Sequence, residues 1–127
     1  MKPSLRTGAT GTSDFAVGEE HTIRFAPALP AMLSTPALLW FLEQAAIRAL
    51  EPGLEAGEIS LGTEVNIQHL APSPSGSPIR CVARLLQADG NQFLFQVEAR
   101  DERGLIARGT HRRVVVSADR LARKLAR

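Results

Sequence analysis

A single carboxylate interrupts the most apolar stretch of the chain. The stretch STPALLWFLEQAAIRAL covers residues 34–50, and Glu43 stands near its middle. The residues three and four positions away from it on a helix are all apolar: Leu39, Trp40, Ala46 and Ile47. Burial makes a carboxylate a better proton acceptor, because it disfavours the charged form. Glu43 is therefore a candidate nucleophile or general base, and a structural glutamate at the margin of an apolar face is the alternative.

Two further residues have side chains that can hold or move a proton. Alternation in LGTEVNIQHL predicts His69 on an apolar strand face, together with Thr63, Val65 and Ile67. His69 is a candidate proton carrier, and a satisfied core histidine is the alternative. Thr35 precedes Glu43 by eight positions, which places both along roughly the same side of a helix. Its hydroxyl could orient the carboxylate or a water molecule, or simply cap the helix.

The residues around Glu43 are predicted to form one helix. Thr35 is the expected N-cap, Pro36 suits the first helical position, and the helix is expected to end near Leu50, before EPG. Only three side chains between Pro36 and Leu50 are polar: Glu43, Gln44 and Arg48. A helix that is apolar around most of its circumference is normally buried on several sides.

The rest of the chain is predicted to form strands. A short strand is expected over HTIRF (21–25), and four longer ones are expected over ISLGTEVNIQHL, PIRCVARLLQ, QFLFQVEAR and GLIARGTHRRVVVS. The loop APSPSGSP and the turns ADGN and DERG connect the four long strands, and Asp89-Gly90 suits a type I′ hairpin. This order predicts an α+β protein with an antiparallel meander packed on one helix. Residues 1–13, rich in Gly, Thr and Ser, are expected to be poorly ordered.

Length and composition limit the possible functions. The chain has 127 residues, of which 44% are hydrophobic, so residues 1–127 are expected to form one domain. The single cysteine, Cys81, excludes an internal disulfide framework and a clustered thiolate metal site, and it fits a reducing, cytoplasmic environment. No apolar run is long enough for a signal peptide or a bilayer span, so we expect no membrane association.

The positive charge is concentrated at the C-terminus. The last eleven residues, SADRLARKLAR, contain four of the 15 basic and one of the 13 acidic residues, so the remainder is close to neutral. Tyrosine is absent and aromatic residues make up 5% of the chain, which argues against a nucleic-acid partner. Residues 118–127 are therefore interpreted as a basic tail, either a solvated end or a short amphipathic helix docked on the body.

Three blocks in the sequence resemble a known family. STPALLWFLEQAAIRAL, GEISLGTEVNIQHLAPSPSG and GLIARGTHRR contain a threonine eight residues before a helix glutamate, a GT(x5)H strand before a proline-containing loop, and a GTH.R strand. Their order and spacing are similar to those of the fluoroacetyl-CoA thioesterase family of hotdog-fold proteins. The resemblance implies a hotdog fold, in which an antiparallel sheet wraps around one long helix, and hydrolysis of a small acyl- or aryl-CoA thioester to the free acid and coenzyme A.

The resemblance also implies roles for individual residues. Thr35, Glu43 and His69 match the catalytic set. Gly62 matches a wall of the substrate pocket, although a glycine in a strand is also simply a bulge or close-approach residue. Arg113, the second arginine of GTHRR, matches a coenzyme A or pocket-organising contact, whereas we assign no chemistry to His111. The segment APALPAMLS before Thr35 lacks the phenylalanines of the family's lid, so we do not expect fluorine selectivity.

The expected partners follow from this assignment. The substrate supplies coenzyme A, and we expect no other cofactor and no metal. One helix cannot cover both faces of a five-stranded sheet, so we expect at least a homodimer with each pocket between subunits. A hotdog acyl-CoA hydratase, a non-catalytic acyl-CoA-binding protein and a purely structural partner protein are the alternative functions.

Overall fold

The computed structural model describes residues 1–3 and 5–126. In chain order, its elements are β1 (Thr10–Ala16), the 3₁₀ turn η1 (Glu19–His21), β2 (Thr22–Ile23), β3 (Met32–Leu33), α1 (Thr35–Leu50), the 3₁₀ turn η2 (Glu51–Gly53), β4 (Glu58–His69), β5 (Pro78–Asp89), β6 (Gln92–Asp101), β7 (Gly104–Ser117) and α2 (Ala118–Leu125). The expected long helix and the four long strands after it are all present, with small differences at their ends.

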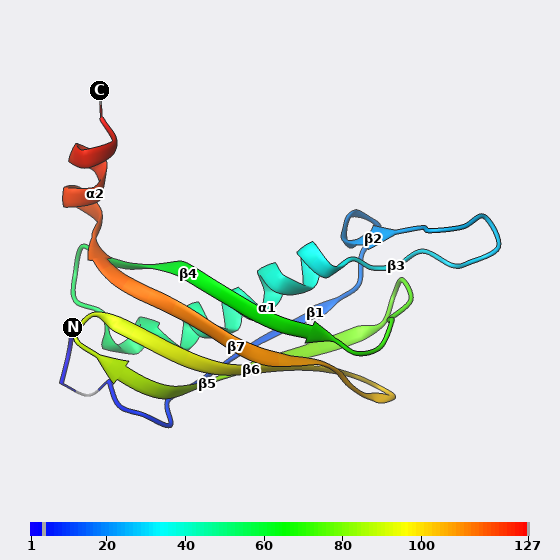
Figure 1. Ribbon diagram of the computed structural model, residues 1–127, viewed down its shortest axis with the longest axis horizontal. Helices are drawn as coiled ribbons and strands as arrows, with labels where there is room; N and C mark the ends of the chain where they lie inside the picture. Colours follow the sequence, from blue (N-terminus) through cyan, green and yellow to red (C-terminus); the bar gives the residue numbers. More distant parts are fainter. Residues whose placement is uncertain (4, 127) are drawn as a thin grey trace.

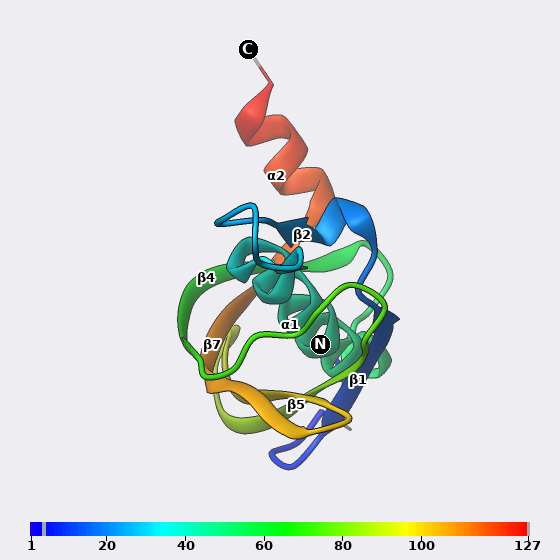
Figure 2. The ribbon, with the colours of Figure 1, turned by 90° about the vertical axis from the view of Figure 1, so that its right-hand side faces the viewer.

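Five strands form one antiparallel sheet in the order β1-β5-β6-β7-β4. The sheet curls around α1, as the side view and the view along the helix both show (Figures 1 and 2). The short strands β2 and β3 pair separately, beside the N-terminal end of α1. The predicted α+β class and antiparallel meander are confirmed.

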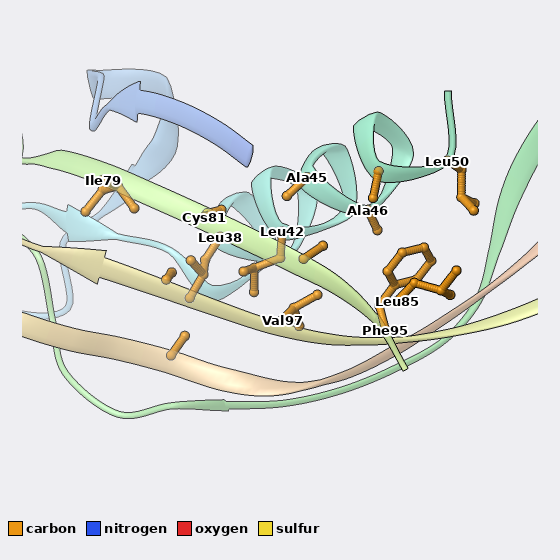
Figure 3. Packing of buried hydrophobic residues seen from close by; sticks show 14 of the residues in the cluster. Leu38, Leu42, Ala45, Ala46, Leu50, Ile79, Cys81, Leu85, Phe95 and Val97 are labelled. Carbon is orange, nitrogen blue, oxygen red and sulfur yellow. The ribbon is translucent and has the colours of Figure 1, made fainter. Parts of the chain in front are cut away.

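The core lies between one face of α1 and the concave side of the sheet. Helix residues buried there are Leu38, Leu42, Ala45, Ala46, Ala49 and Leu50. They pack against strand residues such as Ile79, Leu85, Phe95 and Val97 (Figure 3). The small alanines let the helix approach the sheet closely, and the burial of the larger side chains supplies most of the packing free energy.

The opposite face of α1 is only partly covered. Trp40 is 52% exposed, although the apolar pattern of the helix predicts burial on several sides. The predicted burial is therefore found on the sheet side only.

The N-terminal segment differs from the prediction. Residues 10–13, expected to be poorly ordered, form the first half of β1 and pair with residues 81–84 of β5. Gly11 explains why small residues suit this strand: a Cβ atom there would overlap the carbonyl oxygen of Ala45 and the backbone of Ala49. The composition that suggests disorder instead permits close packing of β1 on α1.

The start of α1 also differs from the prediction. Ser34, not Thr35, is the N-cap, and its hydroxyl accepts a hydrogen bond from the Ala37 N–H at 3.3 Å. Thr35 is the first helical residue, so its hydroxyl is available for another partner. The strand expected over residues 21–25 is shorter, because His21 belongs to η1 and only Thr22–Ile23 pair with β3.

The basic tail forms the short helix α2. Its N-cap is Ser117, whose hydroxyl accepts a hydrogen bond from the Arg120 N–H at 3.2 Å. The helix points away from the sheet in both ribbon views, and Leu125 is 69% exposed, so it is not docked on the body as one interpretation required. Arg127, the last cation of the tail, lies outside the described residues. In the described part of the chain, neither helix has the length and apolarity needed to cross a bilayer.

Candidate active site

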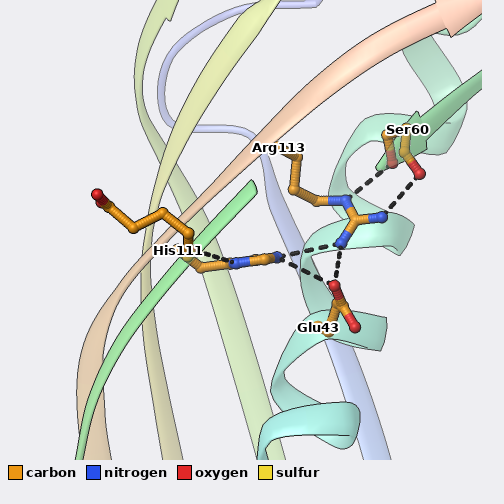
Figure 4. A network of polar contacts seen from close by, with 5 residues as sticks. Glu43, Ser60, His111 and Arg113 are labelled. Atoms are coloured by element: carbon orange, nitrogen blue, oxygen red, sulfur yellow. Dashed lines mark hydrogen bonds and ion pairs between the residues drawn. The ribbon is translucent and has the colours of Figure 1, made fainter. Parts of the chain in front are cut away.

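Glu43 lies in a polar cluster between α1 and the strands β4 and β7 (Figure 4). Its Oε2 accepts a hydrogen bond from Arg113 Nη1 at 2.9 Å and lies 4.0 Å from His111 Nε2. The Glu43 side chain is 28% exposed, whereas those of Arg113 and His111 are 3% and 2% exposed. The carboxylate is thus the most accessible member of a largely buried group.

The guanidinium of Arg113 is held on several sides. Nε donates to Ser60 Oγ at 2.9 Å, and Nη2 donates to the Ser60 carbonyl oxygen at 2.8 Å. Burial lowers the pKa of Arg113, and the hydrogen bond and charge of Glu43 oppose that shift. An arginine still carries its charge at neutral pH. A buried guanidinium with these partners fits the pocket-organising role better than direct contact with a coenzyme phosphate.

Gly62 lies directly against the Glu43 carboxylate. A Cβ atom at this position would overlap Glu43 Oε2, and it would lie 3.1 Å from His111 Cε1 and 3.3 Å from Arg113 Nη1. The residue therefore packs directly against the carboxylate.

A bulge in β4 determines which residues face the helix. The register against β7 shifts between Gly62 and Glu64, so Thr63 is the extra residue of the bulge. Strict alternation would put Gly62 and His69 on opposite faces, because their positions differ by an odd number. With the bulge, Gly62 faces Glu43 while His69 faces Thr35, and both therefore point toward α1.

Thr35 and His69 form a second polar pair at the start of α1. Thr35 Oγ1 lies 2.9 Å from His69 Nδ1, within hydrogen-bonding distance. Both residues line a pocket of about 270 Å³ together with Ser34, Pro72 and apolar residues of β2, β3 and neighbouring loops: Ile23, Phe25, Met32, Leu33, Leu70 and Ala71. Such a mainly apolar pocket with a few polar groups suits a small acyl chain.

His69 combines a lowered pKa with a buried ring nitrogen that has no partner among the described residues. Burial lowers the pKa of His69, with the Ala71 backbone opposing the shift in part, so the imidazole is neutral at pH 7. In the described part of the chain, its Nε2 is the single buried side-chain nitrogen or oxygen without a hydrogen-bond partner. This nitrogen is therefore free to form a hydrogen bond with a bound molecule.

The loop after His69 is fixed by a second set of polar contacts. Asp101, whose side chain is 3% exposed, accepts a hydrogen bond from Ser73 Oγ at 2.9 Å and from the Arg103 N–H at 2.8 Å. Arg103 Nη2 also donates to the Pro72 carbonyl oxygen at 2.7 Å. Burial tends to raise the pKa of Asp101, but the hydrogen bonds from Arg103 and Ser73 lower it overall. The turn between β6 and β7 thereby positions the wall of the pocket.

The two polar groups occupy different parts of the same helix. Thr35 and Glu43 are eight residues apart, which is about 12 Å of helix rise. Within the described residues, no hydrogen bond or ion pair joins Glu43 to Thr35 or His69; the partners of Glu43 are Arg113 and His111. The three residues predicted to be catalytic therefore lie in two separate polar groups within one chain.

Comparisons with known proteins identify the family. Residues 17–119 match the family described as fluoroacetyl-CoA-specific thioesterase. The fluoroacetyl-CoA thioesterase of Streptantibioticus cattleyicolor is 33% identical over 133 aligned residues, covering 98% of this chain and 95% of the relative. This chain belongs to the fluoroacetyl-CoA-specific thioesterase family. The membership predicted from the three sequence blocks is confirmed, as is the prediction of an acyl-CoA thioester hydrolase.

Solved structures agree with this family assignment. A fluoroacetyl-CoA thioesterase superimposes with a TM-score of 0.88 at 32% identity, covering 96% of each chain. A thioesterase superfamily member from Thermus thermophilus has a TM-score of 0.88 at 30% identity, with 98% and 92% of the chains covered. A hot-dog-like protein from Thermanaerovibrio acidaminovorans has a TM-score of 0.86 at 28% identity, with 95% and 90% covered. The predicted hotdog fold is confirmed.

Sequence reasoning missed two members of the cluster around Glu43 in this family member. Ser60 was read only as a strand residue, and His111 was given no chemistry, yet both contact Arg113 directly. Alternation along the two strands offers a signal, because residues two positions apart share a face. Ser60 and Gly62 share a face of β4 before the bulge, and His111 and Arg113 share a face of β7. This signal is usable only once the two strands are known to pair.

Proposed function

We propose that this protein hydrolyses a small acyl- or aryl-CoA thioester to the free acid and coenzyme A, with Glu43, His69 and Thr35 as the catalytic residues. The observation that carries the proposal is a carboxylate, Glu43, held by Arg113 with one oxygen while its side chain remains 28% exposed. Solved structures of variant fluoroacetyl-CoA thioesterases contain fluoroacetate with CoA, or acetyl-CoA. Those proteins are 32% and 31% identical to this chain.

Glu43 supplies the reactive carboxylate, either as nucleophile at the thioester carbonyl or as general base on water. Because Oε2 accepts the Arg113 hydrogen bond, Oε1 is the oxygen available for the reaction. The fixed guanidinium also limits the rotation of the carboxylate, which reduces the entropy lost when the reacting atoms meet. On the general-base route, Glu43 takes a proton from water as the water oxygen adds to the carbonyl carbon, the carbon–sulfur bond breaks, and the sulfur leaves with that proton as the coenzyme A thiol. On the nucleophile route, Glu43 displaces the sulfur to form an acyl–glutamate anhydride, and water then hydrolyses the anhydride to the free acid and restores the carboxylate.

His69 carries that proton, and Thr35 orients the imidazole. When His69 Nδ1–H donates to Thr35 Oγ1, Nε2 is the bare ring nitrogen, and it is the atom that lacks a protein partner within the described chain. The neutral imidazole can then accept the proton at Nε2 and give it, as imidazolium, to the departing sulfur. General acid–base catalysis of this kind typically contributes about 10²- to 10⁴-fold to the rate.

A second copy of the chain completes the site in our proposal. β4 is an edge strand with exposed apolar residues, Ile59, Leu61 and Val65 at 36%, 37% and 45%, and Trp40 of α1 is exposed nearby. Edge strands that carry apolar side chains pair readily with another strand. A two-fold axis passing near Leu39, midway between Thr35 and Glu43, would bring Glu43 of each copy to the Thr35–His69 pair of its partner.

Complementation between inactive variants tests the shared site. Glu43→Gln and His69→Ala homodimers should each lose at least about 100-fold in kcat for thiol release, with unchanged circular dichroism. Mixed and allowed to exchange subunits, they should regain about a quarter of the parental activity, because half of the dimers are mixed and each has one intact site. No recovery despite demonstrated exchange would place the whole site within one chain. Near-parental activity of both single variants would exclude the catalytic assignment itself.

The remaining expectations belong to the same proposal. The reaction consumes only water and the thioester, so treatment with a metal chelator should leave the rate unchanged. We infer a cytoplasmic location, which suits the single thiol of Cys81. We also infer that residues 1–127 form one domain, which predicts a single cooperative unfolding transition. Phe25, 72% exposed in the pocket wall, is the aromatic side chain best placed to contact an acyl group.

A further inference from the structure

His111 is a buried histidine with a different partner at each end of its ring. Its Nδ1 lies 2.8 Å from the carbonyl oxygen of Glu64 on β4, and its Nε2 lies 3.1 Å from Arg113 Nη1 (Figure 4). On β6, the neighbour in register is Phe95, which is fully buried and apolar. No role in catalysis or binding has so far been given to this residue.

These two contacts determine where the ring proton resides. A carbonyl oxygen only accepts hydrogen bonds, so Nδ1 must carry a hydrogen. A guanidinium nitrogen only donates, so Nε2 must be the bare, accepting nitrogen. His111 is therefore a neutral imidazole in the Nδ1–H form, and both assignments agree.

The acceptor at Nε2 determines the direction of the Arg113 donors. Nη1 has two hydrogens, and the contacts assign one to Glu43 Oε2 and the other to His111 Nε2. Ser60 accepts from Nε and Nη2 on the other side of the same guanidinium. The plane of the guanidinium is thus fixed from both sides, and the hydrogen directed at Glu43 cannot rotate away without breaking another bond.

We propose that His111 is a positioning residue, which directs Arg113 toward Glu43 by accepting the second Nη1 hydrogen. This inference rests on the proposed role of Glu43. His111 touches neither substrate nor reacting atoms; it acts through Arg113. The charged groups that face its ring are Arg113 from β7 and Glu43 from α1, while β4 presents a carbonyl oxygen and β6 an apolar ring.

Protonation of His111 would reverse this arrangement. An Nε2–H would face the Arg113 N–H groups at 3.1 Å, which would place two donors and two positive charges together. The closest acceptor, Glu43 Oε2 at 4.0 Å, could then draw the carboxylate away from Arg113. The positioning of Glu43 therefore requires the neutral form, and acid should impair kcat more than KM.

Two variants separate the acceptor role from simple packing. His111→Leu retains the volume without the acceptor, and kcat should fall about 10- to 100-fold with little change in KM, because a misplacement of about 1 Å is enough for such a loss. His111→Gln places an amide oxygen near the position of Nε2, and kcat should recover to within about fivefold of the parent. The Gln variant should also lose less activity between pH 7 and pH 5, since one titrating group is gone. Equal losses in the two folded variants would overturn the proposal.

A spectroscopic measurement does not depend on either variant being stable. The chain has three histidines, so ¹⁵N spectra of the labelled parent can be assigned with His21→Ala and His69→Ala variants. We expect the His111 imidazole to be protonated on Nδ1 and bare on Nε2 at pH 8. An Nε2–H or charged His111 would overturn the proposal. If Glu43→Gln were active while the spectrum was as expected, the proposed role of Glu43 would fail and the hydrogen-bond assignment of His111 would stand.

Discussion

Gly62→Ala tests whether the position of the Glu43 carboxylate limits catalysis. The new methyl group would overlap Glu43 Oε2, so that oxygen must withdraw by about 1 Å to reach an ordinary contact distance. Gly62 does not have a positive φ, so alanine is compatible with the backbone there. The overlapping atom is the end of a flexible side chain that is 28% exposed, so we expect the fold to adapt.

The cost should appear in activity rather than in stability. A withdrawal of this size breaks or weakens the 2.9 Å hydrogen bond between Arg113 Nη1 and Glu43 Oε2. Hydrogen bonds to charged groups contribute about 1.5–3 kcal/mol. A change of roughly 1.4 kcal/mol in the activation free energy alters the rate tenfold. If that bond positions Glu43 in the transition state, its loss should therefore lower kcat/KM by about 10- to 150-fold.

Thiol release from a short acyl-CoA, followed with a thiol-reactive chromogen, measures this loss. Thermal unfolding should shift by only a few degrees, because no core side chain changes. Asn66→Ala, an exposed position of the same strand, is the matched control and should leave both quantities unchanged. In a Glu43→Gln background, Gly62→Ala should cost almost nothing further, since the two changes act on one interaction. Parental activity in Gly62→Ala, or an additive loss in the double variant, would refute the reasoning.

Three further predictions use other parts of the structure. Deletion of residues 118–127 should change KM by less than about twofold, because α2 points away from the body. Arg113→Ala should lower kcat at least about tenfold, because Glu43 loses its hydrogen-bond donor. Steady-state kinetics of both variants test these two expectations. Burial raises the pKa of the Cys81 thiol to about 12, so thiol titration at pH 8 should detect it only after denaturation. Burial also lowers the pKa of His69 and of His111, so the unfolded chain binds protons that the folded chain excludes. The free energy of unfolding, measured with urea, should therefore decrease as the pH falls below about 6.5, and the part of the decrease due to the two histidines should level off below their folded pKa values.

The order of helix and strands was predictable because each of these elements has a strong local signal. The apolar helix with its proline near the start, and the alternating strands separated by glycine-containing turns, require no knowledge of tertiary contacts. β1 was missed for the converse reason. Its Gly and Thr residues have no apolar pattern, and their value lies in the close approach of Gly11 to α1.

The geometry of the candidate site could not be predicted from the sequence. The family resemblance grouped Thr35, Glu43 and His69 as one predicted set, whereas the structure pairs Thr35 with His69 and Glu43 with Arg113. Gly62 is itself a signal for the bulge at residues 62–64, but a strand glycine does not reveal which later residues change face. Without the bulge, Gly62 could not face the same side of the sheet as His69. The choice of Ser34 over Thr35 as N-cap is a difference of one position between two good capping residues.

The pocket beside Thr35 and His69, proposed to hold the acyl group, is bounded by a segment outside the main sheet. β2 and β3 are two-residue strands that pair with each other, and Met32 also forms a bridge with Pro74. The two strands supply Ile23, Met32 and Leu33 to the pocket wall. Leu33 is buried, but Ile23 is 45% exposed, and substitutions at such positions remove little core packing. In the proposed site, substitutions in this segment should therefore change the substrate range without disturbing the contacts that hold Glu43. A library limited to residues 23–32 is a rational starting point for redirecting the enzyme toward other acyl groups.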